Sequence, residues 1–490
     1  MKRKINYIVS SILVFLSFLI FYGKRWFFAT FDDLALDEIF FHLKVPLKGS
    51  NTDFVLEFIK GPFLKALVVA VFIVLFVSIF LYLIKKSRFE VKFKNYFLYI
   101  PAISLLIVST TNTMIALDAH TFILNNLDNS TFYDDNYVEV DDELLTFPEE
   151  KRNLIYIFVE SYEATFTSID HGGALKENLF GDLIDIADNN VNFSHNLKIG
   201  GATPATGTGW TVGGMVAQTS GVHLKLPIDG NSYGEFQSFL PGVTSIGDIL
   251  ENHGYNQTLF IGSDADFGGR SNYFTQHGNY EIKDYKFALD TGLIPEDYHE
   301  WWGYEDQKLF EFAKKDILEL SKEDKPFNFT MLTADTHHVD GYLGEDTEEL
   351  FDEQYKNVIF NTSKQLLDFI AWAQKQDFYE NTTIVIAGDH NTMDAGFIER
   401  NVESDFERRI FNLFLNAPLE AVNQKNRLFS PMDLFPTTLA SLGVEIDGER
   451  IALGTNLFSK KETLFEEYGV VEVNQELAKS SRFYSNNILQ

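Results

Sequence analysis

The hydrophobic positions divide the chain into a front part and a longer second part. Three mostly apolar runs come first, at Ile5–Phe21, Phe63–Ile84 and Tyr96–Leu117. The second and third are long enough to cross a bilayer as helices, and the first is near the lower limit. A cleaved signal peptide is the alternative for the first run, but no small-residue cleavage site follows it, which favours an uncleaved anchor. We therefore predict about three transmembrane helices within residues 1–117.

Basic residues predict the orientation of these helices. Lys2, Arg3 and Lys4 precede the first run, and Lys85–Arg88 lies in the short loop between the second and third. The loop between the first and second runs carries acidic residues beside its basic ones. The positive-inside rule then places the N-terminus in the cytoplasm and everything after about residue 118 outside. The pattern predicts a multi-pass protein of the cell (plasma) membrane whose main domain is extracytoplasmic.

After the apolar runs, short β-rich segments alternate with helical patterns. Such alternation is typical of an α/β fold in which helices sandwich a mostly parallel sheet. We predict an acidic linker at 118–152, a catalytic domain at 153–460 and a C-terminal tail at 461–490. The expected strands are Asn153–Val159, Gln257–Ile261, Phe327–Thr333, Thr382–Ala387 and Phe411–Leu415, and the expected helices include Val243–His253, Gln307–Leu320 and Asp352–Lys375.

Charge and cysteine content exclude several functions. The formal net charge of -30 argues against a nucleic-acid partner, which would require a basic surface, and is explained by a well-solvated exterior. The chain has no cysteine, so an exported domain would be held by its core and not by disulfides. Chemistry that needs a thiol or a cysteine-derived formylglycine is excluded as well.

Ionisable residues follow three of the expected strands. Glu160 follows Val159, His337 and His338 come shortly after Thr333, and Asp389-His390 follows the fourth strand. The carboxyl ends of strands in an open α/β sheet carry the ligand site. Taken singly, these residues could be a helix cap, a surface loop and a turn. Their joint occurrence favours a site for a divalent cation such as Mn²⁺, Zn²⁺ or Mg²⁺.

The Gly- and Thr-rich segment Gly201–Met215 leads into a helical pattern. Its periodic face contains Thr211, Val212 and Met215, which places Thr208 at or just before the first helical turn. Free backbone N–H groups there suit an oxygen that must become an anion, although a simple N-cap is the alternative. Bound to a cation, the Thr208 hydroxyl would be the fourth metal ligand and an activated nucleophile.

Two further residues suit a phosphate substrate. His337 could position phosphate oxygens or protonate a leaving alkoxide. Arg270 follows the strand Gln257–Ile261 and could grip a phosphate with two hydrogen bonds, although a surface arginine is the alternative.

These segments, in this order, resemble the alkaline phosphatase and sulfatase superfamily. Within it, the chain is similar to the lipoteichoic acid synthase family and to phosphoglycerol transferases that decorate cell-envelope glycans. The resemblance covers most of residues 150–460. It rests on Asn153–Ser161, Thr208–Met215, Trp302–Asp306, Thr336–His338, Gly388–His390 and Pro431–Thr437.

The resemblance implies a role for each site residue. Thr208 matches the nucleophile, His337 the substrate-side histidine and Arg270 an arginine that contacts phosphate. Lipoteichoic acid synthases carry a histidine and a bulky aromatic where this chain has Ile261 and Gly268, so the loop is closer to the glucan-decorating transferases. The metal ligands are matched by Glu160, Asp389 and His390.

The implied activity is metal-dependent transfer of a phosphoglycerol head group. The donor would be a phospholipid, phosphatidylglycerol first, the acceptor an envelope glycan or glycolipid, and the intermediate a covalent phospho-threonine. Mn²⁺ is the first choice of metal, with Zn²⁺ or Mg²⁺ as alternatives. The alternative functions are phosphoethanolamine transfer, phosphodiester hydrolysis and a non-catalytic, membrane-tethered binding protein. Sulfatase action is not expected, because no Cys or Ser stands in the motif that formylglycine formation needs.

Overall fold

The structure is a computed structural model that describes residues 2–32, 36, 38–39, 53–86, 96–225, 238–344 and 347–490. The chain falls into two compact units, one made of Met1–Leu36 and Asn51–Leu124 and the other made of Asp37–Ser50 and Asn125–Gln490. Each unit is described by itself.

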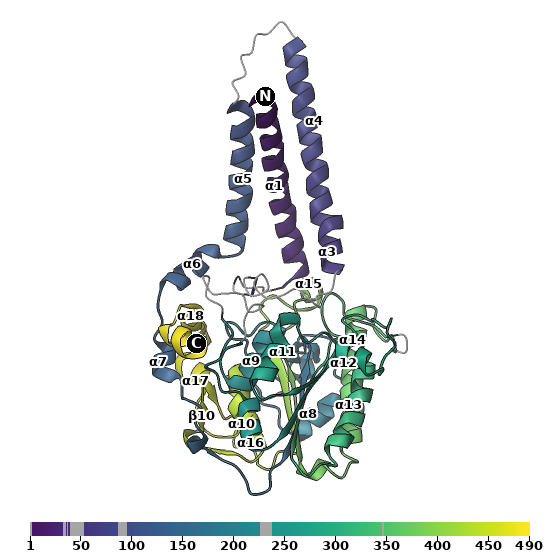
Figure 1. Ribbon diagram of the computed structural model, residues 1–490, viewed down its shortest axis with the longest axis vertical. Helices are drawn as coiled ribbons and strands as arrows, with labels where there is room; N and C mark the ends of the chain where they lie inside the picture. The colour runs from purple at the N-terminus through teal and green to yellow at the C-terminus, as the bar shows by residue number, and fades with distance from the viewer. Residues whose placement is uncertain are drawn as a thin grey trace. The chain divides into compact units, whose positions relative to one another are not determined.

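The first unit is a group of long helices (Figure 1). Helix α1 packs against α4, where the hydroxyls of Tyr7 and Ser78 lie 2.8 Å apart. The unit holds three helices long and apolar enough to cross a membrane, as predicted, and the first is longer than expected because its apolar residues continue to Thr30. Much of the charge used to predict the orientation, including residues 87–95, lies outside the described residues. The helices are α1 (Lys2–Thr30), α3 (Asp53–Phe58), α4 (Leu64–Lys86) and α5 (Tyr96–Ala116), with a π-helical turn at Ile59–Phe63.

The second unit is built on a seven-stranded sheet with the order β3-β8-β7-β2-β6-β4-β5. The pairs among β7, β2, β6, β4 and β5 are parallel, and β8 runs antiparallel to both β7 and β3. The five predicted strands are all present, and the mostly parallel α/β fold is confirmed. The strands are β2 (Asn153–Val159), β3 (Gly201–Ala202), β4 (Asn256–Ile261), β5 (Glu281–Lys283), β6 (Phe327–Leu332), β7 (Thr382–Gly388) and β8 (Ile410–Leu415).

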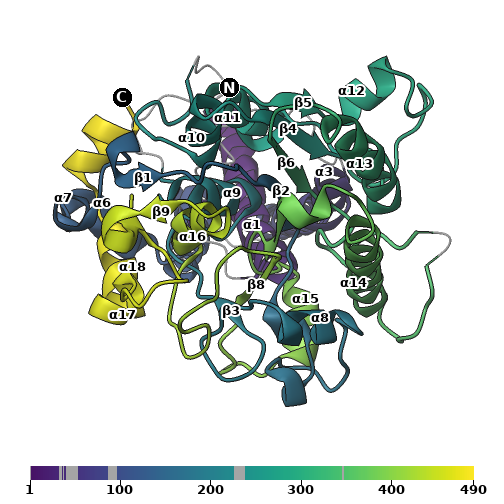
Figure 2. The same ribbon diagram turned by 90° about the horizontal axis from the view of Figure 1, so that it is seen from below.

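Helices cover both faces of this sheet (Figure 2). On β2, Ile155 and Ile157 belong to a core that also contains apolar residues of α8, α13 and α14. Tyr156, between them, points to the opposite face and donates a hydrogen bond of 2.8 Å to Gln218 of α9. This alternation explains why β2 is apolar throughout, since both of its faces are buried. The helices are α8 (Leu183–Asn189), α9 (Thr211–Ser220), α10 (Ile246–Asn252), α11 (Arg270–Gln276), α12 (Tyr285–Asp290), α13 (Asp306–Leu320), α14 (Gln354–Ala373), α15 (Ala395–Asn401) and α16 (Leu434–Ser441).

From Asn125 onward, the segment predicted as an acidic linker is part of the second unit instead. It forms α6 (Ala119–Leu127), α7 (Phe132–Asn136) and β1 (Leu145–Thr146), and β1 pairs with β9 (Glu445–Ile446). Tyr133 is buried, and its hydroxyl lies 2.8 Å from Nδ1 of His223. The linker prediction followed the acidic residues and overlooked the apolar ones between them.

The C-terminal segment is not a peripheral tail either. It forms α17 (Leu464–Tyr468) and α18 (Val470–Ala478), and a capping box at Thr463 fixes the start of α17. The side chain of Asn474 accepts a hydrogen bond of 2.7 Å from the amide of Thr206, so α18 supports the loop before α9. A two-stranded β10–β11 hairpin (Arg450–Ile451 and Gly454–Thr455) precedes this segment.

Candidate metal and nucleophile site

Glu160, Asp389 and His390 come together at the carboxyl ends of two neighbouring strands. Parallel pairing sets Val159 beside Gly388, so the residues that follow β2 and β7 emerge side by side. One ligand atom from each of the three residues lies within 4.8 Å of the others, and all three side chains are buried. Oε1 of Glu160 lies 3.3 Å from Nε2 of His390. The three predicted metal ligands therefore form one cluster.

Neighbouring groups orient the ligand atoms of this cluster. Nδ1 of His390 lies 2.7 Å from the carbonyl oxygen of Asn391 and must carry the hydrogen, which leaves Nε2 to face the cluster. Oδ1 of Asp389 accepts hydrogen bonds of 2.8 Å from the amides of Ser161 and His390. Oδ2 of Asp389 is buried and has no hydrogen-bond partner among the described residues. That oxygen is therefore available as a ligand.

The charges in the cluster favour a bound cation. Burial and the nearby Glu160 carboxylate raise the pKa of Asp389 well above its usual range. Burial alone would lower the pKa of His390, but Asp389 and Glu160 raise it to about 10. The site therefore stabilises positive charge strongly. A divalent cation carries two positive charges where a proton carries one, so it is stabilised there as well. Two carboxylates and one imidazole fit Mn²⁺ or Zn²⁺, and Mg²⁺ less well.

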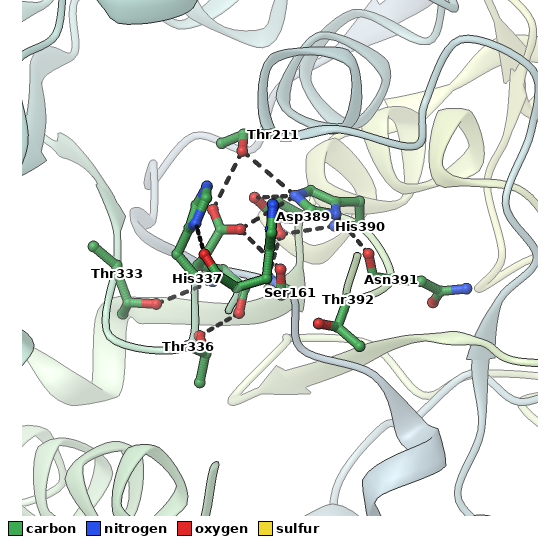
Figure 3. Close-up of polar contacts among 12 residues, drawn as sticks. Ser161, Thr211, Thr333, Thr336, His337, Asp389, His390, Asn391 and Thr392 are labelled. Atoms are coloured by element: carbon green, nitrogen blue, oxygen red, sulfur yellow. Dashed lines mark hydrogen bonds and ion pairs between the residues drawn. The ribbon is translucent and has the colours of Figure 1, made fainter. Parts of the chain in front are cut away.

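Thr211, and not Thr208, lies against this cluster. Oγ1 of Thr211 is 3.2 Å from Oε2 of Glu160 and 3.4 Å from Nε2 of His390 (Figure 3). The Thr208 hydroxyl is fully buried and engaged elsewhere, since it donates to the carbonyl oxygen of Ala205 at 2.9 Å and accepts from the Ala205 amide at 3.0 Å. The structure therefore does not bring Thr208 to Glu160 and His390, and the hydroxyl that lies beside them is that of Thr211.

The start of α9 explains the difference. Trp210 is the N-cap with an extended backbone, and the first helical hydrogen bond runs from Gly214 N to Trp210 O at 2.8 Å. Thr211 is therefore the first helical residue, where backbone N–H groups lack helical partners and the helix dipole is positive. Thr208 lies three residues earlier, in a turn closed on Ala205. The environment predicted for Thr208 is the one that Thr211 has.

Close packing holds α9 against the cluster. A Cβ atom at Gly214 would lie 2.0 Å from the carbonyl oxygen of Asp389, so only glycine allows this approach. Gln218 of the same helix donates a hydrogen bond of 2.8 Å to the carbonyl oxygen of Gly388. The helix that carries Thr211 is thus fixed to the strand end that carries two of the ligands.

Gly214→Ala should therefore destabilise the protein, whereas Gly209→Ala should not. The added methyl at Gly214 must push α9 from Asp389, and such overpacking costs about 1–3 kcal/mol of unfolding free energy. A Cβ at Gly209 meets nothing within 4 Å. Thermal unfolding of the two variants measures the difference. Equal unfolding temperatures would contradict the close contact between α9 and Asp389.

Arg270 lies near the cluster, but its hydrogen bonds within the described residues go to other groups and not to Glu160, Asp389 or His390. Its Nη2 donates to the Ser263 hydroxyl at 3.2 Å and to the Asp264 carbonyl at 2.8 Å. Its Nε is buried without a hydrogen-bond partner in the described part of the chain. Burial lowers the pKa of Arg270 to about 10, with Glu160 among the groups that raise it, so the side chain stays cationic at neutral pH. A buried cation with an unused donor is suited to an anionic ligand.

His337 stands beside the same cluster (Figure 3). Its Nδ1 lies 2.8 Å from the carbonyl oxygen of His338 and carries the hydrogen, so Nε2 has the free lone pair. Burial lowers the pKa of His337, while the Glu160 charge raises it and the charges of His390 and Arg270 lower it. The ring is therefore a neutral imidazole at neutral pH, able to accept a proton at Nε2.

The sequence analysis gave no role to several supporting residues. The Thr333 hydroxyl accepts a hydrogen bond of 3.0 Å from the Glu160 amide, and the Thr336 hydroxyl donates to the Glu160 carbonyl oxygen. The Ser161 hydroxyl donates to Oε1 of Glu160 at 2.8 Å. Their only signal in the sequence is their position directly after strands, which many loop residues share.

Comparison with known proteins places the second unit in a family. The family model described as Sulfatase matches residues 152–444, more than half of the chain. The chain belongs to the sulfatase family. The resemblance seen in the sequence is confirmed at this level.

Curated relatives and solved structures agree with this assignment. The chain is 30% identical to phosphoglycerol transferase I of Citrobacter koseri over 254 residues, which are 51% of this chain and 32% of that protein. It is 29% identical to phosphoglycerol transferase I of Salmonella choleraesuis over 320 residues, 64% of this chain and 40% of that one. The chain thus spans well under half the length of these relatives.

Two solved structures share the fold. The lipoteichoic acid synthase LtaP from Listeria monocytogenes superposes with a TM-score of 0.51 and 17% identity, covering 67% of this chain and 80% of its own. The lipooligosaccharide phosphoethanolamine transferase A (EptA) from Neisseria meningitidis is an integral membrane protein. It superposes with a TM-score of 0.50 and 15% identity, covering 89% of this chain and 84% of its own. At this identity the likeness concerns the fold, which is the predicted alkaline-phosphatase-like α/β architecture.

Proposed function

We propose that this protein is a membrane-anchored phosphotransferase that moves a phosphoglycerol head group from phosphatidylglycerol to a glycan or glycolipid of the cell envelope. The observation that carries the proposal is the Thr211 hydroxyl, 3.2 Å from Glu160 and 3.4 Å from His390 at the start of α9. Relatives of the matched region are named phosphoglycerol transferases. The extracytoplasmic orientation drawn from the basic loops gives the site access to lipid head groups of the outer leaflet.

In the first step, Thr211 attacks the phosphorus of the donor. A bond forms between Oγ1 and phosphorus, and the bond from phosphorus to the diacylglycerol oxygen breaks. When bound, a divalent cation (Mn²⁺ first, Zn²⁺ or Mg²⁺ as alternatives) would lower the pKa of the Thr211 hydroxyl and offset charge on the phosphoryl group. Arg270 grips the non-bridging oxygens. Neutral His337 takes the Thr211 hydroxyl proton at Nε2 before the attack and then gives it to the leaving diacylglycerol oxygen, so that the ring ends neutral.

In the second step, an acceptor hydroxyl resolves the phosphoglyceryl-threonine. The hydroxyl gives its proton to Nε2 of His337 as its oxygen attacks phosphorus. The bond to Oγ1 of Thr211 breaks, and His337 then returns the proton to the Thr211 oxygen. This step separates a transferase from a hydrolase, because water can resolve the same intermediate. A transferase must hold the acceptor in line so that it competes with water at roughly 55 M.

A labelled donor tests the proposal. With phosphatidylglycerol labelled in the head-group glycerol, diacylglycerol should form slowly alone and faster with envelope glycan, and the label should move to the glycan. Fast release of free glycerol phosphate, independent of any glycan, would make the protein a phosphodiester hydrolase. Consumption of phosphatidylethanolamine in place of phosphatidylglycerol would make it a phosphoethanolamine transferase. Absence of turnover with every lipid would favour a membrane-tethered binding protein.

A further inference from the structure

The segment Trp302–Asp306 stands out in the sequence, yet the proposed mechanism gives it no task. In the structure, its first residue lies in the site. The Trp302 ring centroid is 4.6 Å from that of His337 and 5.4 Å from that of Phe267. The guanidinium carbon of Arg270 lies 5.7 Å from the Phe267 ring centroid. Trp302 therefore shares one wall of the site with the two residues assigned to the substrate.

The loop around Trp302 is fixed to the loop that carries His337. Trp301 donates from Nε1 to the carbonyl oxygen of Ala334 at 3.1 Å. The Asp306 carboxylate accepts from the amides of Ala334 and Asp335 at 2.8 and 2.9 Å. These bonds hold the two loops together on both sides of Trp302.

The same loop is also fixed to the segment that holds Arg270. Gly303 pairs with Ser263 in a β-bridge, and Ser263 is a partner of Arg270. A Cβ atom at Gly303 would lie 2.2 Å from the carbonyl oxygen of Gly262, so the backbones of these two segments are in direct contact. Trp302 is thus placed by the loop that carries His337 and by the segment that holds Arg270.

Two hydrogen-bond donors on this wall are buried and unused. Nε1 of Trp302 and Nε of Arg270 have no hydrogen-bond partner among the described residues. A buried polar group without a partner is rare in native proteins, because it has lost its water and gained nothing. Arg270 is only 5% exposed, so bulk water does not satisfy it either. A bound ligand with oxygen acceptors would satisfy both donors.

We infer that Trp302 recognises the head group of the donor, with its indole N–H donating to a hydroxyl oxygen of the glycerol while Arg270 holds the phosphate. The inference rests on the proposed function and adds a specificity residue to it. A hydroxyl oxygen can accept from the indole, whereas the ammonium of ethanolamine offers only donors. The adjacent guanidinium also repels an ammonium. The wall therefore selects a neutral polyol head group over a cationic one.

The test combines one variant with two donors. Trp302→Phe keeps a ring and removes the N–H. With phosphatidylglycerol, its kcat/KM should fall about tenfold, the value of one buried hydrogen bond. With phosphatidylethanol, whose head group has no free hydroxyl, wild type and Trp302→Phe should be equal. Trp372→Phe, on α14 and outside the site, controls for the general effect of replacing a tryptophan by phenylalanine.

If Trp302→Phe lowers kcat/KM equally with phosphatidylglycerol and phosphatidylethanol, the inference is overturned and Trp302 has only a structural role. A binding measurement separates this outcome from failure of the proposed function. Calorimetric titration of the full chain with sn-glycerol 1-phosphate should show about tenfold weaker binding to Trp302→Phe than to wild type, and titration with ethyl phosphate should show no difference. If wild type binds glycerol phosphate in this way but turns over no lipid, the proposed function fails and the role of Trp302 stands. If both proteins bind the two ligands alike, the inference fails.

Discussion

Thr211→Ala is expected to reduce turnover of phosphatidylglycerol by at least about 10³-fold, because it removes the group that forms the covalent intermediate. The variant should still fold, since Thr211 lies at the partly exposed start of α9 and its side chain does not cap the helix. Thr211→Ser keeps a hydroxyl in the same place and should retain measurable activity. The measurement is diacylglycerol release from detergent-solubilised protein of verified thermal stability.

Thr208→Ala is the matched control for this experiment. It removes a threonine hydroxyl three residues before Thr211. Among the described residues, that hydroxyl bonds only to the backbone of Ala205. Loss of these bonds should cost about 1–3 kcal/mol of stability and change the rate less than tenfold. The reverse pattern, with Thr208→Ala inactive and Thr211→Ala active, would restore the assignment drawn from the sequence.

Glu160→Gln is expected to weaken metal binding by more than about 100-fold, since loss of a directly coordinating group should exceed the 10–100-fold typical of outer-shell partners. Glutamine has the same shape, so the packing around residue 160 should persist while the ligand charge is lost. The measurement is elemental analysis of the purified protein, followed by titration of Mn²⁺ and Zn²⁺ while the unfolding temperature is recorded. A cation that binds only the folded state raises that temperature, so a weaker site gives a smaller rise.

Glu353→Gln provides the control for this charge change. Glu353 pairs with Arg400 at 3.0 Å and lies outside the metal cluster. Its replacement should leave the metal content at the level of wild type. Equal metal content in wild type, Glu160→Gln and Glu353→Gln would mean that the cation binds elsewhere.

The sequence predicted the sheet and the clustering of Glu160, Asp389 and His390 well because both follow from strong local signals. Five short apolar runs became β2, β4, β6, β7 and β8. The carboxyl ends of parallel strands meet at one edge, so Glu160 and Asp389 could be placed together before their distance was known. This reasoning needs only the strand ends, which apolar runs mark clearly.

The threonine beside the metal-ligand cluster was misplaced because helix boundaries are weakly encoded. Thr208 comes just before the apolar stretch and Thr211 begins it. The periodic pattern assigned Thr211 to the packing face of the helix. The start of α9 depends on the extended backbone of Trp210 and on the turn that Thr208 closes on Ala205. Neither is visible as periodicity. A shift of three residues was enough to put a different threonine beside Glu160 and His390.

The two flanking segments were underestimated for a related reason. The stretch 118–152 is acidic on average, yet Phe132 and Tyr133 within it are buried. The C-terminal segment is held in part by Lys225, which donates to carbonyl oxygens at the end of α18. No local sequence pattern predicts this long-range contact. Average polarity describes the exposed side of such segments and not the few apolar residues that anchor them.

The most direct test of the central claim is to locate the covalent intermediate. Purified full-length protein is incubated with phosphatidylglycerol without acceptor, quenched, digested and mapped by tandem mass spectrometry. The account predicts a phosphoglyceryl group on Thr211 in wild type and in Thr208→Ala, and none in Thr211→Ala. A phosphoglyceryl group on Thr208 or Thr206, or its persistence in Thr211→Ala, would contradict it.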